Sequence, residues 1–477
     1  MAPSSSLSSE LEKQQLDAPT AVVRTNLEKD DKGNVYVEEE HVVVDAVFGE
    51  ISRGGPNYRG VHWIHATVLL IKTQIGLGVL GIPAVLTSLG LGPGLALIFI
   101  MGFITTWSGH VLHHFKLKHP EVYSMADVGY ILGGVWGREI LGAIYWLLLT
   151  SVAGASMLGF ATALNNITDN AGCTAVWALV GAILIFLVSA IRTLERISWL
   201  SWVGLAGILG AVLTLAVAVG VQDRPDAAPQ VGPWDPQVLV VAHPSFFDAM
   251  TALSTISFSF AGPPNFVSIV AEMRRPKDFT KSLIACQIVV TLTYAIIGAV
   301  VYHFCGVYVS SPALGSAGPL LKKVCYGIAL PGLVIGGVLN VHLTSKYSFL
   351  RITLWLNKTE HVNSNSLKSW MFWLSFVLAN VGIAYVIAEA IPFFGDLVSL
   401  IGALLATCIA ITVWGWAWLH QNRERIMTER TPGLIALAII NVLLVALGAF
   451  IQVAGTIAAG KAIHASLLAG LAKPFSC

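Results

Sequence analysis

Charged residues are scarce in this sequence. Lysine, arginine, aspartate and glutamate make up 12% of its 477 residues, about half of the share in soluble domains. Hydrophobic residues make up 55%, and the mean hydropathy is +0.73. The formal net charge is only +1, so the chain lacks the basic excess of a nucleic-acid-binding protein. This composition excludes a soluble globular protein and indicates an integral membrane protein.

Cysteine is also scarce, and its spacing fits neither a metal site nor a redox motif. The six cysteines form no CxxC pair, so no metal or cofactor is expected. Cys305 and Cys325 flank one loop and could form a disulfide, although buried free thiols are the preferred interpretation. Residues 1–62 lack the apolar segment of a signal peptide. Because this segment is rich in serine and charged residues, we predict a disordered cytosolic tail.

Catalytic motifs are missing as well. The absence of GxSxG, Walker and HExxH patterns gives no support to a hydrolase or an ATP-driven pump. The stretch "HVLHH" (His110, His113, His114) matches one histidine box of membrane di-iron enzymes. That chemistry needs several imidazoles held together, and the remaining histidines form no second box. We therefore predict a polar cluster at the end of a membrane span, and no enzyme.

Long apolar runs, in contrast, are abundant. Many have about 18 to 25 residues, which is enough to cross about 30 Å of hydrocarbon. We predict an all-α polytopic protein of eleven spans. They lie near 63–87, 92–115, 139–164, 172–190, 199–221, 246–272, 282–305, 324–345, 368–389, 394–418 and 432–457. The end of the chain, 458–477, is too short for a twelfth span and is expected to be a short non-cytosolic tail.

Lysine and arginine are distributed unequally between the two sides of this map. They gather in the N-terminal tail and in alternate connections, which predicts a cytosolic N-terminus. The sequon at Asn166 then falls on the non-cytosolic side, in a loop so short that its glycosylation stays open. The sequon at Asn357 falls on the cytosolic side and is expected to stay unmodified. The plasma membrane is the expected location, with the vacuolar membrane as the alternative.

Two of the predicted spans contain residues that interrupt helices. The first, "TVLLIKTQIGLGVLGIPAVL" (67–86), has three glycines and a proline within 76–83, and the sixth has Gly-Pro-Pro at 262–264. Breaks near 76–79 and 260–264 would leave backbone groups that must face protein, water or ligand. Ordinary kinking or packing is the alternative interpretation. Paired breaks in corresponding positions of two five-helix blocks favour a transporter site at the bilayer midplane.

Several stretches resemble the amino acid/auxin permease family of the amino acid–polyamine–organocation superfamily. They are "IGLGVLGIP", "SMADVGYILGG", "SFAGPPNFVSIVAEMRRP" and "PFFGDLVSLIGAL". The stretch "LIKTQIGLGVLGIP" is most similar to fungal N-system (methyltryptophan-resistance type) neutral amino-acid permeases. The resemblance implies a leucine-transporter-like fold over residues 63–457, with inverted five-helix repeats (63–221 and 246–418) and one extra helix (432–457). It also implies amino-acid import driven by protons or sodium.

The broken helices suit the zwitterionic backbone of an amino acid. Free amides at the start of the second half of span one would face a carboxylate, and free carbonyls at the end of the first half of span six would face an ammonium group. Glycines allow a ligand to approach the main chain closely. The predicted substrate-binding residues are Ile75, Gly76, Leu77, Gly78, Val79, Phe258, Ser259, Phe260, Gly262, Asn265 and Asn340.

Lys72 is the one clear charge near the middle of a span. A lone lysine there costs about 2.5–3.5 kcal/mol even on a lenient insertion scale, so it should face the interior of the bundle. In sodium-coupled relatives an asparagine commonly stands at this position, and we therefore favour protons over sodium. Thr344 and Ser345 of "HLTSK" are expected to share this coupling site. Because no other charge is available to a substrate side chain, the predicted cargo is neutral, both aliphatic and aromatic amino acids. A membrane sensor that binds an amino acid without transporting it is the alternative.

Overall fold

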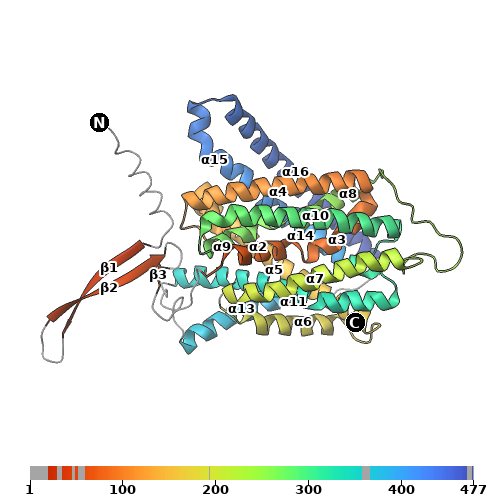
Figure 1. Ribbon diagram of the computed structural model, residues 1–477, viewed down its shortest axis with the longest axis horizontal. Helices are drawn as coiled ribbons and strands as arrows, with labels where there is room; N and C mark the ends of the chain where they lie inside the picture. Colours follow the sequence, from red (N-terminus) through yellow and green to blue (C-terminus); the bar gives the residue numbers. More distant parts are fainter. Residues whose placement is uncertain are drawn as a thin grey trace.

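Long helices, packed side by side, form the body of the protein (Figure 1). The computed structural model describes residues 60–192, 194–356, 366–469 and 475, together with the backbone of strands in the N-terminal tail. The first half contains α2 (Trp63–Gln74), α3 (Leu77–Leu89), α4 (Leu91–Lys118), α5 (Met125–Ile167), α6 (Thr174–Ser189) and α7 (Leu194–Val221). The second half contains α8 (Phe246–Ser259), α9 (Pro263–Ala271), α10 (Phe279–Cys305), α11 (Pro319–Trp355), α13 (Leu367–Ala390), α14 (Phe394–Ile401), α15 (Val413–Thr428) and α16 (Pro432–Leu468).

Single turns complete the helical part. Three are 3₁₀ turns, η1 (Pro276–Asp278), η2 (Gly306–Tyr308) and η3 (Ala313–Ser316), and two are π-helical, η4 (Gly402–Ala406) and η5 (Cys408–Thr412). The π-helical segment begins at Gly402, where the chain passes very close to α8. A methyl group added at Gly402 would lie only 2.0 Å from the carbonyl oxygen of Ser254. Glycine at 402 therefore permits this contact.

By length and composition, eight of the described helices can cross a membrane, or nine if the bent pair α2–α3 counts as one span. The expected eleven would also include α6, which has 16 residues, and the short pair α8–α9. The apolar helices and their order agree with the predicted all-α membrane fold, while the number eleven stays a prediction. α5 is mostly buried and α16 mostly exposed, so α5 lies in the core of the bundle and α16 at its edge.

Both predicted helix breaks are confirmed. α2 ends at Gln74 and α3 begins at Leu77, with a bend of 45° between them. This break begins at Ile75, one residue before the predicted 76–79, because the Gly76 amide donates to the Gln74 carbonyl (2.9 Å) and does not reach back to Lys72. α8 ends at Ser259 and α9 begins at Pro263, as the Gly-Pro-Pro sequence predicts.

Two boundaries differ from the sequence-based expectation. α5 begins at Met125, well before the predicted 139, because a capping box between Ser124 and Asp127 starts a helix in "SMADVGYILGG". Non-helical angles at Gly133 and Gly134 separate this short piece from the long one. α16 continues to Leu468, so much of the supposed tail after 457 is helix; no proline interrupts this alanine-rich stretch.

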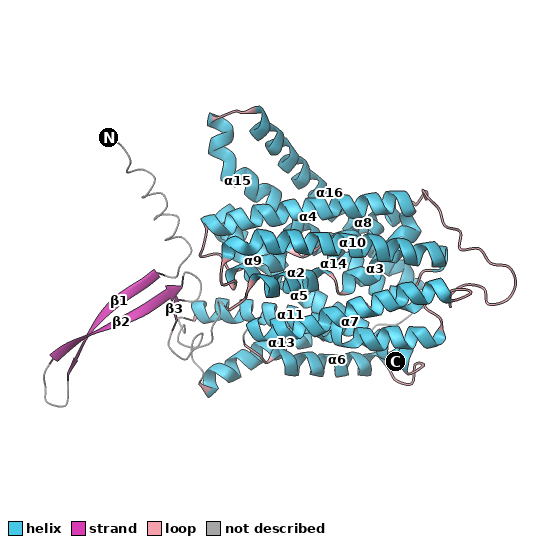
Figure 2. Cartoon of the chain, viewed as in Figure 1, coloured by secondary structure: helices cyan, strands magenta, loops and turns pink. Residues whose placement is uncertain are grey.

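The N-terminal tail also differs from the expected disorder at three segments. β1 (Thr20–Lys29), β2 (Val35–Asp45) and β3 (Gly49–Ile51) form an antiparallel sheet in the order β1-β2-β3, shown in magenta in Figure 2. β1 pairs with β2 along its whole length, from Thr20 opposite Val44 to Lys29 opposite Val35. Both strands are rich in valine, which favours an extended backbone.

Cys305 and Cys325 flank one loop, and the sequence left open whether they form a disulfide. Cys305 and Cys325 are free and buried. They lie at the end of α10 and near the start of α11, and they serve as small apolar side chains of the core.

Candidate functional site

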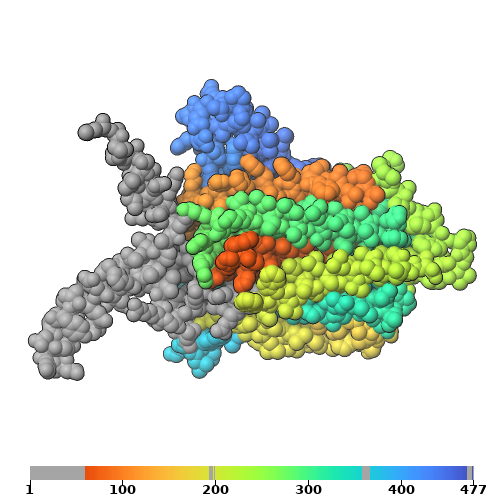
Figure 3. Space-filling view, in the orientation of Figure 1, coloured from red at the N-terminus to blue at the C-terminus, as the bar shows by residue number. Residues whose placement is uncertain are grey.

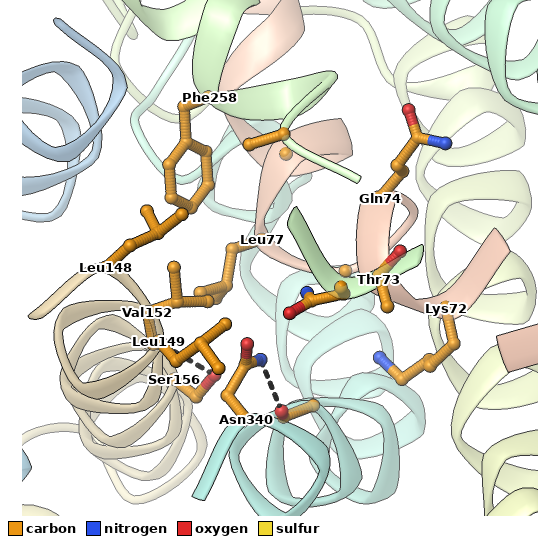
Figure 4. Close-up of a pocket in the computed structure, with 15 residues that line it drawn as sticks. Lys72, Thr73, Gln74, Leu77, Leu148, Leu149, Val152, Ser156, Phe258 and Asn340 are labelled. Atoms are coloured by element: carbon orange, nitrogen blue, oxygen red, sulfur yellow. Dashed lines mark hydrogen bonds between the residues drawn. The ribbon is translucent and has the colours of Figure 1, made fainter. Parts of the chain in front are cut away.

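A small cavity lies where the two broken helices meet α5 and α11 (Figure 4). It encloses about 30 Å³, which is room for roughly one or two water molecules. α3 packs against α8 beside it, so the cavity joins the first break to the second. The residues that line it are Lys72, Thr73, Gln74, Gly76, Leu77, Gly78, Leu148, Leu149, Val152, Ser156, Phe258, Ala261, Asn265, Gly336 and Asn340.

The first break presents the amino end of α3 to this cavity. Gly76 is the N-cap of α3 and supplies no side chain to its first amides, while Leu77 and Gly78 line the cavity. The first amides of a helix have no carbonyl partner within the helix, and they carry its positive dipole end. This edge of the cavity therefore suits a negatively charged group.

The second break presents the carboxyl end of α8. The amide of Ala261 donates to the carbonyl of Phe258 (3.0 Å), so it does not bond to Ser257 as a continuing helix would require. Phe258 and Ala261 both line the cavity. Carbonyl groups at a helix C-terminus carry partial negative charge, and this edge suits a positively charged group.

One phenol holds the two breaks together. The hydroxyl of Tyr294, from α10, lies 2.8 Å from the carbonyl oxygens of both Gln74 and Ser259. Its single proton can be donated to either of these acceptors. Ser259 adds a second link, because its hydroxyl lies 3.2 Å from the carbonyl oxygen of Gly78. The relative position of the broken helices is thus fixed by side-chain hydrogen bonds as well as by packing.

Lys72 points into the cavity from α2 (Figure 4). It is 3% exposed, and its ammonium nitrogen makes no hydrogen bond to any described residue. A methyl group added at Gly76 or at Gly336 would lie 3.4 Å from this nitrogen. The ammonium group therefore lies between the first break and α11, at the level of Gly336.

Two asparagines add acceptors without partners. The side-chain oxygens of Asn265 (α9) and Asn340 (α11) are buried and form no hydrogen bond within the described part of the chain. The Asn340 amide nitrogen donates to the Gly336 carbonyl (2.9 Å), which fixes the direction of the side chain. The cavity thus combines an unpaired cationic donor with unpaired acceptors. Buried groups of this kind normally have partners, so the arrangement is typical of a ligand site.

Not all predicted site residues line the cavity. Those that do are Lys72, Gly76, Leu77, Gly78, Phe258, Asn265 and Asn340. The others are buried close to the breaks but are not among the lining residues: Ile75, Val79, Ser259, Phe260 and Gly262. A methyl group at Gly262 would meet the Phe266 ring of α9 at 2.5 Å.

Thr344 and Ser345 do not join Lys72. The Thr344 hydroxyl donates to the Asn340 carbonyl (2.8 Å), and the Ser345 oxygen accepts from the Asn380 amide (3.1 Å). Thr344 lies eight residues beyond Gly336 along α11, about 12 Å at 1.5 Å per residue. The structure therefore does not bring Lys72, Thr344 and Ser345 together at one coupling site.

The wall contributed by α5 was not predicted. Leu148, Leu149, Val152 and Ser156 lie on one face of this helix and turn toward the cavity (Figure 4). Their sequence is an ordinary apolar span, and its Gly154 does not distinguish it, because the other predicted spans contain glycine too. Only the packing of α5 against α11 assigns this face to the site. In the same way, only the packing of α10 against α2 and α3 brings Tyr294 to the breaks.

A buried ion pair lies between this site and the end of the bundle where the N-terminal tail enters. The Lys346 ammonium (α11) lies 2.6 Å from Glu272, at the end of α9, and both side chains are nearly inaccessible. The Tyr123 hydroxyl donates to the same carboxylate oxygen (3.1 Å). The backbone of Val61 is hydrogen-bonded to Glu272 and Arg274. This end of the bundle is therefore closed by contacts between α9, α11, the α4–α5 connection and the segment before α2.

The three histidines of the "HVLHH" box are not gathered as a set of metal ligands in the structure. No group of three or more potential ligands gathers anywhere in the described residues. His113 turns toward α10, where its Nδ1 atom lies 2.8 Å from the Thr280 hydroxyl. His110 and His114 stack edge to face on the outer side of α4.

Comparison with known proteins covers most of the chain. The family model described as "Transmembrane amino acid transporter protein" matches residues 59–458. The chain is 34% identical to the "N amino acid transport system protein" of Neurospora crassa, over 90% of each chain. It is also 34% identical to a "Transmembrane transporter" of Gibberella moniliformis, over 89% of this chain and 88% of that protein.

A solved structure shares the fold. It is that of Mhp1, described as a nucleobase-cation-symport-1 family transporter, in a closed conformation with bromovinylhydantoin bound. The match covers 88% of this chain and 96% of that one, with a TM-score of 0.50 and 15% sequence identity. At this identity the likeness concerns the arrangement of helices.

Proposed function

Because the chain belongs to the transmembrane amino acid transporter family, we propose that it imports neutral amino acids by cation-coupled symport. The observation that supports this most directly is the cavity between the two helix breaks. Unpaired amides of α3 face it from one side and the carboxyl end of α8 from the other. An amino acid would place its carboxylate at the first and its ammonium group at the second.

The residues that line the cavity support a neutral cargo. Lys72 is the one charged residue among the lining residues, which otherwise are apolar or uncharged. A cationic side chain would meet the Lys72 ammonium group, and an anionic one would compete with the substrate carboxylate for the amino end of α3. Leu148, Val152 and Phe258 offer apolar contact to aliphatic or aromatic side chains. The enclosed 30 Å³ is far below the size of an amino acid, so these side chains must move apart to admit one.

Transport requires that the site open to each side in turn. The ion pair of Lys346 and Glu272 lies between the site and the end of the bundle where α2 begins. We assign this end to the cytosol, because lysine and arginine concentrate there. In this assignment the substrate leaves toward the cytosol when α9 separates from α11. The plasma membrane is the proposed location.

We assign the coupling role to Lys72, with a proton as the coupled ion. Its ammonium nitrogen is buried and unpaired within the described residues, beside Gly76 and Gly336. A lysine that merely stabilised frayed carbonyls would be hydrogen-bonded to them, and this one is not. Loss and regain of the lysine proton at this site would add or remove one charge beside the substrate during each cycle. Thr344 and Ser345 lie elsewhere and are not part of this assignment.

Uptake by cells that express the full chain tests the proposal. Radiolabelled leucine, phenylalanine and alanine should accumulate, and lysine and glutamate should not. Uptake of lysine or glutamate without any of the neutral amino acids would contradict the proposed cargo. Binding of leucine to the purified protein without any flux into proteoliposomes would instead identify an amino-acid sensor.

A further inference from the structure

A second cavity lies on the outer side of the bundle, between α4 and α15. Figure 1 shows that the corner between α15 and α16 stands away from the other helices, and in Figure 3 it projects beside α4. The cavity has a volume of about 410 Å³, many times that of the site between the broken helices. Its lining residues are Trp107, His110, Val111, His114, Leu117, Lys118, Trp418, Gln421, Asn422 and Arg425.

We propose that this cavity binds the headgroup of an anionic phospholipid. Its two walls are faces of two helices, because the lining residues of α4 and of α15 follow at intervals of three and four. Lys118 and Arg425 supply two permanent positive charges, and none of the lining residues is acidic. Basic pockets between membrane helices are suited to phosphate-bearing headgroups.

Arg425 is partly engaged but keeps a donor for a ligand. Its Nε and one terminal nitrogen each donate to the Glu429 carboxylate at 3.0 Å. Within the described residues its other terminal nitrogen makes no hydrogen bond, and the guanidinium group stays exposed. The Gln421 amide nitrogen is buried and makes no hydrogen bond within the described residues, whereas that of Asn422 donates to the Trp418 carbonyl (2.9 Å). The paired rings of His110 and His114 add imidazole nitrogens to the lining. A phosphate group would find donors of Arg425, Lys118 and Gln421 in one cavity.

The position of the cavity selects a lipid as the source of the phosphate. Along α4 the outer face changes from exposed Phe103 (77% exposed) through Trp107 to His110, His114 and Lys118. This order runs from an apolar surface through an indole to basic groups. Tryptophan is enriched where hydrocarbon meets the headgroup layer. A phospholipid can therefore place its phosphate near Lys118 and its acyl chain along Phe103, whereas a free phosphate would use only the basic end.

The test is native mass spectrometry of the full chain in detergent, titrated with dioleoyl phosphatidylserine or dioleoyl phosphatidylcholine. The wild type should retain one phosphatidylserine molecule with at least about tenfold preference over phosphatidylcholine. The variant K118Q/R425Q should lose this preference, and K118R/R425K should keep it. The control R275Q/K281Q removes two exposed charges at the same end of the bundle and should behave like wild type.

Three results would overturn the proposal. The first is equal retention of both lipids by the wild type. The second is an unchanged preference in K118Q/R425Q while the protein elutes and melts like wild type. The third is displacement of phosphatidylserine by millimolar inorganic phosphate, which would identify a site for a free anion. None of the substituted charged residues lines the cavity between the broken helices. Normal amino-acid uptake by intact cells that express each variant therefore serves as a separate control for folding.

Discussion

The ammonium group of Lys346 lies 2.6 Å from the carboxylate of Glu272, and both are buried. The two residues are 74 positions apart in the chain and belong to α11 and to the end of α9. The α9 half of the sixth span is thereby fixed to α11 on the side of the site from which substrate is proposed to leave. Removing one partner of a buried ion pair strongly destabilises a protein, because the other partner is left as an uncompensated buried charge.

Single and double substitutions of this pair should therefore differ in the size of their effect on stability. Glu272→Ala or Lys346→Met alone should lower stability by about 3–5 kcal/mol, measured as a lower melting temperature in detergent. The double variant E272Q/K346M should recover most of the loss, because no charge remains buried. A double variant that is less stable than either single variant would contradict this account.

Tyr294→Phe should loosen the two helix breaks. It removes the only hydroxyl shown to contact both Gln74 and Ser259 carbonyls among the described residues, and we expect a loss of about 1–3 kcal/mol with reduced uptake. Tyr302→Phe is the matched control, because Tyr302 is buried on the same helix but contacts Leu239 in a connecting segment. Equal effects of the two substitutions on the KM for leucine would show that Tyr294 has no special relation to the site.

Gly76 and Gly78 should respond differently to alanine. A methyl group at Gly76 would lie no closer than 3.4 Å to any neighbour, whereas at Gly78 it would lie 2.8 Å from Ser259 Cα and the Tyr294 hydroxyl. Gly78→Ala should reduce both folding and uptake. Gly76→Ala should fold normally and raise the KM for the substrate. The check is surface expression combined with concentration-dependent uptake; normal transport by Gly78→Ala would show that the contact can relax.

Lys72→Ala should abolish the dependence of amino-acid uptake on the pH gradient. Wild-type uptake should rise as the external pH falls and should not need sodium, because a proton is the proposed coupled ion. Lys72→Ala should retain binding of leucine while losing accumulation against a gradient. The measurement is uptake into proteoliposomes at several pH values with and without sodium. Sodium-dependent, pH-insensitive uptake by the wild type would refute proton coupling, and an unchanged pH response in the variant would place the proton site elsewhere.

Leu148→Ala should shift the choice of substrate toward bulkier side chains. Leu148 lines the cavity opposite the broken helices, and truncation removes three carbon atoms from that wall. Differences of one methylene in an apolar pocket change discrimination about 10- to 200-fold. We expect the ratio of kcat/KM for phenylalanine to that for alanine to rise by about tenfold in competition uptake. Ile98→Ala is the control, since Ile98 is buried in α4 away from the cavity lining.

The local chemistry of the chain determined where its helices break. Glycine at 76 and 78 and the Gly-Pro-Pro at 262–264 act on their own backbone, so both interruptions could be located from the residues alone. The membrane fold likewise follows from long apolar runs that have no other stable environment. The position of Lys72 within one of these runs was enough to place it inside the bundle.

Only the tertiary structure decided which side chains of different helices face one another and the site. Tyr294, the α5 wall and the pairing of Lys346 with Glu272 depend on the rotation and depth of helices far apart in sequence. In an apolar span, hydrophobic residues cover every side of the helix, so no periodic pattern marks the side that faces the site. Thr344 was expected beside Lys72 from the hydroxyl residues of "HLTSK", but the depth of α11 brings Gly336 there instead. Packing between helices, which is set by the shapes of many side chains at once, decides these contacts.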